Sequence, residues 1–153
     1  SNKELLITKG ADEVIVDDGN ISDKIRVIFP EGVDCAIDVV GVATIKDTLR
    51  TIKPFGALCV VGVLTGPPVF ENFNLMSDLP NTVKINFFSS GLFGSVEMPL
   101  SDSPIQWIIE QIENKKMPSI VSKIYEFDQI RKAHLNMENN NVLKKISNYF
   151  FYK

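Results

Sequence analysis

The sequence predicts an α/β fold built on a partial doubly wound parallel sheet. Two short apolar runs, Cys35–Val40 and Ala57–Val61, are each followed by a glycine, and such runs are typical of strands buried on both faces. Between them Ile45, Leu49 and Ile52 recur at three- and four-residue spacing, which indicates a helix. A strand, a helix and a strand of these lengths form one βαβ unit with a right-handed crossover. Ligands of open α/β sheets bind at the carboxyl ends of the strands, where the two glycines lie.

Three shorter elements are expected before this unit. Lys3–Lys9 is expected to be the tail of a helix, because Gly10 follows it as a stop signal. Glu13–Val16 is β-branched and is expected to be a short strand. Ile21–Phe29 has isoleucines on one helical face, and Ser22 is a candidate N-cap. No capping sequence or strand precedes the first helix, so the chain is expected to begin in the middle of a fold.

The second half of the chain is expected to contain one more sheet strand, a long helix and a terminal strand–helix–strand. The long helix carries a stripe of isoleucines beside Trp107, which is interpreted as core. The order of the elements belongs to the α/β class. The expected boundaries are strand Val83–Phe88, helix Ser103–Asn114, strand Ile120–Phe127, a helix capped by Asp128 that runs to about Asn139, and strand Val142–Tyr152.

Composition is that of an ordinary soluble domain, and residues 1–153 are expected to form a single one. Hydrophobic residues make up 44% and charged residues 23%, with a formal net charge of −3. No basic block indicates nucleic acid, and no apolar stretch reaches the roughly 20 residues that span a bilayer. Cys35 and Cys59 are interpreted as small buried hydrophobes in a reducing compartment, which favours the cytoplasm.

Few residues are candidates for chemistry. Asp38 either contacts a ribose or, as the favoured interpretation, bonds backbone amides of the next loop. Gly41 and Gly62 are either plain turn glycines or positions where a ligand approaches the backbone. His134 is the single histidine and is interpreted as structural or exposed. One histidine and two separated cysteines make no zinc constellation, so no metal is expected.

Several segments in order resemble the medium-chain dehydrogenase/reductases, and most closely their zinc-independent quinone oxidoreductase branch. The phosphate-binding Gly-x-Gly-x-x-Gly turn of that family is absent from the 153 residues. The resemblance therefore implies the second half of a Rossmann cofactor domain, without its first strand, glycine-rich turn and second strand. The matching segments are Gly10–Ile15, Gly32–Asp34 leading to Asp38–Gly41, Phe55–Gly56 leading to Val61–Gly62, and Tyr125–Asp128 with Ile130, Ala133, His134, Met137 and Glu138.

The resemblance also implies a set of contacts to NADP or NAD. Lys144 stands where the family usually has a glycine, and Asp17 stands where relatives often have a tyrosine over the adenine. The resemblance implies hydride transfer from reduced nicotinamide to a quinone or an α,β-unsaturated carbonyl, with the cofactor supplying the reactivity. No catalytic side chain is expected, because nothing in this chain offers a proton donor fixed near such a substrate. The implied contacts are Val39, Val40 and Gly41 after one strand, Gly62 and Val63 after the next, Phe88 and Ser89 after the third, and Lys145 near the C-terminus.

Three expectations concern how such a fragment behaves. Alone, it is expected to bind dinucleotide poorly and to be inactive, because the helix N-terminus that binds pyrophosphate is missing. The apolar strand Val83–Phe88 is expected to pair with its copy in a homodimer. Glu13–Val16 is expected to pair in parallel with Cys35–Val40, unless upstream residues or a second chain fill that gap. The rival hypothesis is a catalytically inactive module that acts in oligomerisation or protein interaction.

Overall fold

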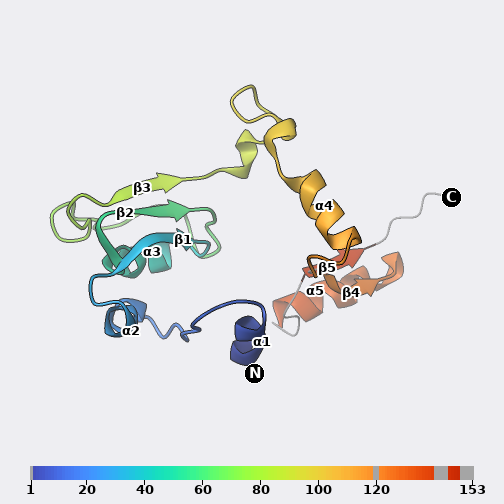
Figure 1. The fold of residues 1–153 in the computed structure, drawn as a ribbon, viewed down its shortest axis with the longest axis horizontal. Helices are drawn as coiled ribbons and strands as arrows, with labels where there is room; N and C mark the ends of the chain where they lie inside the picture. Colours follow the sequence, from blue (N-terminus) through green and yellow to red (C-terminus); the bar gives the residue numbers. More distant parts are fainter. Residues whose placement is uncertain (1, 119–120, 140–144, 149–153) are drawn as a thin grey trace. The chain divides into compact units, whose positions relative to one another are not determined.

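The computed structural model describes residues 2–118, 121–139 and 145–148, and the chain divides into two compact units. The first unit comprises Lys3–Met98 and the second begins at Pro99. Figure 1 gives the course of the chain through both units.

The first unit contains the predicted parallel sheet. Its strands are β1 (Val33–Asp38), β2 (Ile52–Val60) and β3 (Lys84–Phe87), in the order β1-β2-β3 and all parallel (Figure 1). Helix α3 (Val42–Arg50) connects β1 to β2, which confirms the βαβ unit. Since the strands are parallel, their carboxyl ends lie at one edge of the sheet. The partial doubly wound fold is therefore confirmed.

The core of this unit lies between α3 and β2. Leu49 and Leu58 have no exposed surface, and Ile52 is 1% exposed. Ile45 and Leu49 are four residues apart, so they share the face of α3 that packs on the sheet. Burying each such side chain contributes about 1.5–3 kcal/mol. The spacing that predicted the helix is thus the spacing that forms the core.

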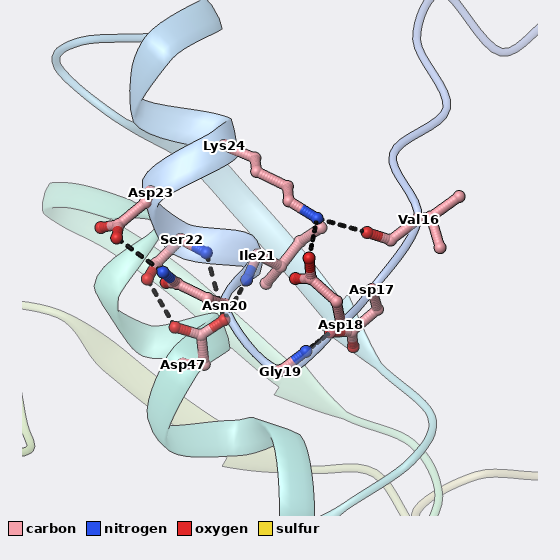
Figure 2. A network of polar contacts seen from close by, with 10 residues as sticks. All are labelled: Val16, Asp17, Asp18, Gly19, Asn20, Ile21, Ser22, Asp23, Lys24 and Asp47. Carbon is pink, nitrogen blue, oxygen red and sulfur yellow. Dashed lines mark hydrogen bonds and ion pairs between the residues drawn. The ribbon is translucent and has the colours of Figure 1, made fainter.

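Helices α1 (Asn2–Thr8) and α2 (Ile21–Ile28) precede the sheet, and α2 is capped by a residue of α3. Asp47 Oδ2 accepts the backbone N–H of Ile21 at 2.6 Å and that of Ser22 at 3.1 Å, and Asp47 Oδ1 accepts the Ser22 hydroxyl (Figure 2). The N-cap position is Asn20, which makes no side-chain cap bond. Ser22 is therefore not the N-cap, and the expectation for it is wrong.

The C-terminal end of α3 is in turn capped by a side chain of α2. The Arg26 guanidinium donates to the carbonyl oxygen of Arg50 at 2.9 and 3.1 Å and to that of Ile52 at 3.1 Å. The last carbonyls of a helix lack intrahelical partners, so Arg26 satisfies one of them. Asp47 of α3 thus caps the N-terminus of α2, and Arg26 of α2 caps the C-terminus of α3. These two contacts fix α2 beside α3.

The expected strand Glu13–Val16 does not form, and no described residue pairs with the outer edge of β1. Lys24 Nζ donates to the carbonyl oxygen of Val16 at 2.9 Å and pairs with Asp18 at 2.7 Å (Figure 2). These bonds hold the segment against the start of α2, and α2 is itself fixed on α3. The expectation that this segment closes the gap beside β1 is therefore wrong.

The face of β1 that points away from α3 is exposed, because side chains alternate between the two faces of a strand and Ala36 and Asp38 lie on the face toward α3. Cys35 is exposed and Cys59 is half-buried, so the interpretation of both as buried hydrophobes is wrong. Ile37 is 73% exposed. The apolar run was correctly assigned to a strand, but no described element covers the face of the strand on which Cys35 and Ile37 lie. Composition reports that a strand can be buried, and it does not report what covers it.

The second unit contains a two-stranded parallel sheet and its connecting helix. Strands β4 (Val121–Tyr125) and β5 (Lys145–Asn148) pair in parallel, and η3 (Phe127–Gln129) and α5 (Ile130–Glu138) lie between them in sequence. This confirms the terminal strand–helix–strand, while residues 142–144 and 149–152 of the last expected strand lie outside the described residues. Gln129, not Asp128, occupies the N-cap position of α5, so that expectation is wrong.

Tyr125 anchors α5 on β4. Its ring is 1% exposed, and its hydroxyl accepts the side-chain amide of Asn136 at 2.6 Å. Lys123 Nζ lies 5.0 Å from the centre of the same ring. A buried tyrosine hydroxyl needs such a partner, so this bond fixes the position of the helix.

Helix α4 (Ile105–Glu113) follows the short helix η2 (Leu100–Asp102) and buries no side chain fully. Trp107 is 55% exposed and Ile105 is 58% exposed. The interpretation of this stripe as core is therefore wrong, because Ile108 and Ile112 are only half-buried and the rest of the stripe is exposed. Among the described helices, none has both the length and the apolar character needed to cross a membrane.

Candidate functional site

Two loops meet at the carboxyl edge of the first sheet. The turn Val39–Gly41 follows β1, and Gly62–Val63 follows β2. The N–H of Leu64 donates to the carbonyl oxygen of Val40 at 2.8 Å, which joins the two loops. These are the positions that the resemblance implies for the cofactor.

Both glycines are required for the contact between the loops. A Cβ on Gly62 would lie 2.4 Å from the carbonyl oxygen of Val39. Gly41 has a φ of +99°, and a Cβ on it would lie 3.0 Å from Val63 Cα. A side chain at either position would force the backbones apart. Gly41 and Gly62 therefore have a structural reason to be glycine, whatever ligand approaches them.

Asp38 lies at the base of the turn and accepts hydrogen bonds at both carboxylate oxygens. Oδ1 accepts the N–H of Val40 at 2.9 Å and of Gly41 at 2.8 Å. Oδ2 accepts the hydroxyls of Thr44 at 2.8 Å and Thr48 at 2.9 Å. The favoured interpretation of Asp38, as a residue that bonds the amides of the next loop, is confirmed.

Opposing effects act on the pKa of Asp38. Burial raises it, because the residue is only 5% exposed and desolvation penalises the charged form. The hydrogen bonds from Gly41, Thr44, Thr48 and Val40 favour the carboxylate and together outweigh burial, so the pKa lies below its ordinary value. The buried group is therefore a charged anchor at neutral pH.

The chain after β3 reaches the same edge of the sheet. The N–H of Phe88 donates to the carbonyl oxygen of Val60 at 2.8 Å, and its ring meets Phe93 edge-on at 5.6 Å. Ser89 Oγ accepts the N–H of Gly91 at 3.3 Å. The structure thus brings together all the predicted contacts except Lys145. That residue begins β5 in the second unit, opposite Val121, and its side chain lies outside the described residues.

An apolar pocket of about 440 Å³ opens beside Val63. The loop between β2 and β3 contributes Pro68 and Phe70 to its lining. Lys46 of α3 binds the same loop, because its Nζ pairs with Asp78 at 2.8 Å and donates to the carbonyl oxygen of Asn72 at 2.9 Å. All the lining side chains except that of Asn86 are apolar, so the pocket suits an apolar group. Its lining consists of Val42, Ile45, Val60, Val63, Pro68, Phe70, Ile85, Asn86 and Phe87.

The turn after β1 offers no free amides to a pyrophosphate, and the described residues form no metal cluster. The amides of Val40 and Gly41, at the start of α3, already donate to Asp38, so they are not free for a pyrophosphate. No group of three or more histidine, cysteine, aspartate or glutamate side chains lies close enough to hold a metal ion in the part of the chain that the structure describes. His134 lies on α5 and Cys35 on β1, in different units.

Sequence reasoning missed Thr44 and Thr48. They lie one helical turn apart on α3, on the face toward β1, and both donate to Asp38. A pair of hydroxyl residues four apart, in a helix that follows an aspartate and a glycine, is a signal that could have found them. Asp47, which caps α2, gave no local signal because its partners lie 25 and 26 residues away.

Comparisons with known proteins identify relatives of this arrangement. The sequence profile of a family described as zinc-binding dehydrogenases matches residues 9–146. No curated protein matches the sequence significantly.

Solved structures share the fold. The structure of AibC superposes with a TM-score of 0.73 at 24% identity, over 95% of this chain and 38% of that one. The mycobacterial protein Rv1454c complexed with NADPH gives 0.74 at 20% identity, over 97% and 45%. An NAD-dependent alcohol dehydrogenase gives 0.72 at 16% identity, over 97% and 41%. The chain spans less than half of the length of these relatives.

Proposed function

Because the chain belongs to the zinc-binding dehydrogenase family, we propose that it forms the nicotinamide-side part of a cofactor-binding domain in an NAD(P)-dependent oxidoreductase. The resemblance to medium-chain dehydrogenase/reductases seen in the sequence is confirmed by this match and by the shared fold. The observation that carries the proposal is the joined pair of loops at the carboxyl edge of β1 and β2. Ligands of open α/β sheets bind at that edge.

The residues of this chain bind and orient the cofactor. Val39 is 52% exposed beside the turn, and its apolar surface suits the uncharged face of a nicotinamide ring. Val63 and Phe88 extend the apolar surface along the same edge. When bound, the reduced cofactor supplies a hydride, and the protein positions it and excludes water. The similar structures include Rv1454c complexed with NADPH and an NAD-dependent alcohol dehydrogenase, so either cofactor is proposed for this chain.

Zinc does not fit the described residues. A catalytic or structural zinc ion needs three or four ligands from histidine, cysteine or carboxylates, and no such group is formed in the described part of the chain. The zinc-independent branch of the family is therefore the one proposed for this chain. A quinone or an α,β-unsaturated carbonyl is the proposed substrate class, which the apolar pocket beside Val63 supports.

The open edge of β1 supports the proposal that further residues complete the domain. Cys35 and Ile37 are also exposed on the face of β1 that points away from α3, and the similar solved chains are more than twice as long as this one. The pyrophosphate contacts are expected to come from those further residues, because the amides of the turn are occupied by Asp38.

Calorimetry tests this division directly. The intact protein is here the longer chain that includes the further residues proposed above. Titration of NADH and NADPH into it is expected to show binding, while the 153 residues alone are expected to bind neither in the micromolar range. Micromolar binding by the 153 residues would contradict the division. Absence of binding by the intact protein would contradict the proposed function.

Association through β3 is the proposed mode of dimerisation. The strand lies at the other edge of the sheet, and all its residues are exposed, with Phe87 at 60% and Ile85 at 44%. An unpaired apolar edge can add its two-fold copy. Light scattering at tens of micromolar is expected to show a dimer that Phe87→Lys converts to monomer. A monomeric wild type, or a Phe87→Lys dimer, would exclude this mode and leave the interaction-module alternative without its surface.

A further inference from the structure

A single carboxylate lies at the base of both loops that are proposed to contact the cofactor. Asp38 Oδ1 binds the N–H groups of Val40 and Gly41 in the first loop. The carbonyl of Val40 then accepts the N–H of Leu64 at 2.8 Å and the hydroxyl of Thr65 at 3.4 Å in the second loop. Hydrogen bonds thus run from Asp38 through the turn to the loop after β2.

The other carboxylate oxygen fixes the turn on α3. Thr44 and Thr48 donate to Oδ2 from positions four residues apart, which place both hydroxyls on one face of the helix. Hydrogen bonds to a charged acceptor are stronger than neutral ones. Because Asp38 is buried and both oxygens have partners, its orientation is set by the surrounding donors.

We infer that Asp38 is a positioning residue that holds the turn Val39–Gly41 and the loop Gly62–Thr65 in one arrangement before the cofactor binds, an inference that rests on the proposed function. Asp38 does not contact the cofactor itself, since its oxygens are used inside the protein. A loop that is ordered in advance loses less conformational entropy on binding. Removing the anchor therefore weakens cofactor binding by more than the loss of folding stability alone explains.

The chain offers a matched control in Asp47. Its carboxylate also accepts two backbone N–H groups and a hydroxyl, and it lies in the same unit. Its partners are at the start of α2, and it contacts neither loop through any of these bonds. Replacing Asp47 thus removes a comparable set of hydrogen bonds without releasing the candidate site.

The test uses the intact protein and the variants Asp38→Ala, Asp38→Asn and Asp47→Ala. Cofactor dissociation constants for NADH and NADPH are measured by calorimetry, folding stability by urea, and amide exchange by mass spectrometry without cofactor. Asp38→Ala is expected to raise the dissociation constant about tenfold and to speed exchange in both loops. Asp38→Asn is expected to have a dissociation constant within about threefold of the wild-type value, because the amide oxygen of asparagine accepts the same N–H groups.

Asp47→Ala is expected to lose similar stability, to exchange faster at the start of α2, and to keep the wild-type dissociation constant. Equal weakening by Asp38→Ala and Asp47→Ala, or faster exchange confined to the turn in Asp38→Ala, would overturn the inference. If Asp38→Ala does not fold, the double variant Thr44→Val, Thr48→Val replaces it, and wild-type affinity there is the contrary result. If the wild type binds neither cofactor, the proposed function fails, and the exchange pattern still decides whether Asp38 anchors both loops.

Discussion

The cap that Asp47 supplies to α2 gives a stability prediction that can be worked from the structure. Asp47→Ala removes the acceptor for the N–H groups of Ile21 and Ser22 and for the Ser22 hydroxyl. Loss of a helix cap costs about 1 kcal/mol, and loss of the partner of the hydroxyl costs about 1 kcal/mol more, because Ser22 is only 4% exposed. The expected loss of unfolding free energy is therefore about 2 kcal/mol.

Urea unfolding followed by circular dichroism measures this loss. With a denaturant slope of about 1–3 kcal/mol per molar, the midpoint is expected to fall by about 1 M. Asp23→Ala is the matched control on α2, because the Asp23 carboxylate accepts an exposed hydrogen bond from the Asn20 side chain at 2.7 Å. That control is expected to change stability by less than about 0.5 kcal/mol. Equal effects of the two substitutions would show that Asp47 does not act as the cap, and the reasoning would fail.

Two other predictions concern the candidate site. The stability difference between wild type and Asp38→Asn is expected to be fully present above about pH 5 and to shrink as the pH falls further, because the lowered pKa of Asp38 stabilises the fold only while the carboxylate is charged. A difference that grows in acid, measured by urea unfolding from neutral pH downward, would contradict this. Gly62→Ala is expected to lose about 1–3 kcal/mol of unfolding free energy and to speed amide exchange in the turn, because its Cβ would lie 2.4 Å from the carbonyl oxygen of Val39. A variant with wild-type stability and wild-type exchange would show that the two loops are not in that close contact.

The βαβ unit could be predicted because its signal is local. Ile45 and Leu49 follow the helical period, and the runs on each side are bounded by glycine. Asp38 was also predictable, since an aspartate commonly bonds backbone amides two and three residues later. Periodicity and short-range hydrogen bonding are properties of the sequence alone, and they located the edge of the sheet where the candidate site lies.

The remaining errors arise where contacts with other parts of the chain decide the outcome, because a local pattern does not state those contacts. Cys35 and Trp107 lie on apolar patterns typical of a core, yet both are exposed because no described element packs on them. Glu13–Val16 has the composition of a strand, but tertiary bonds to Lys24 outweigh that weak preference. Asp47 acts across 25 residues or more, a distance at which a single sequence carries no pairing signal.

The most direct test of the proposed function is amide exchange in the intact protein with and without NADH or NADPH. The account predicts that added cofactor slows exchange in the turn Val39–Gly41, in the loop Gly62–Thr65 and at Phe88–Ser89, while the start of α2 is unchanged. Slower exchange at these three segments together would place the cofactor at the carboxyl edge of the first sheet. Saturating cofactor that leaves all three unchanged would contradict the account.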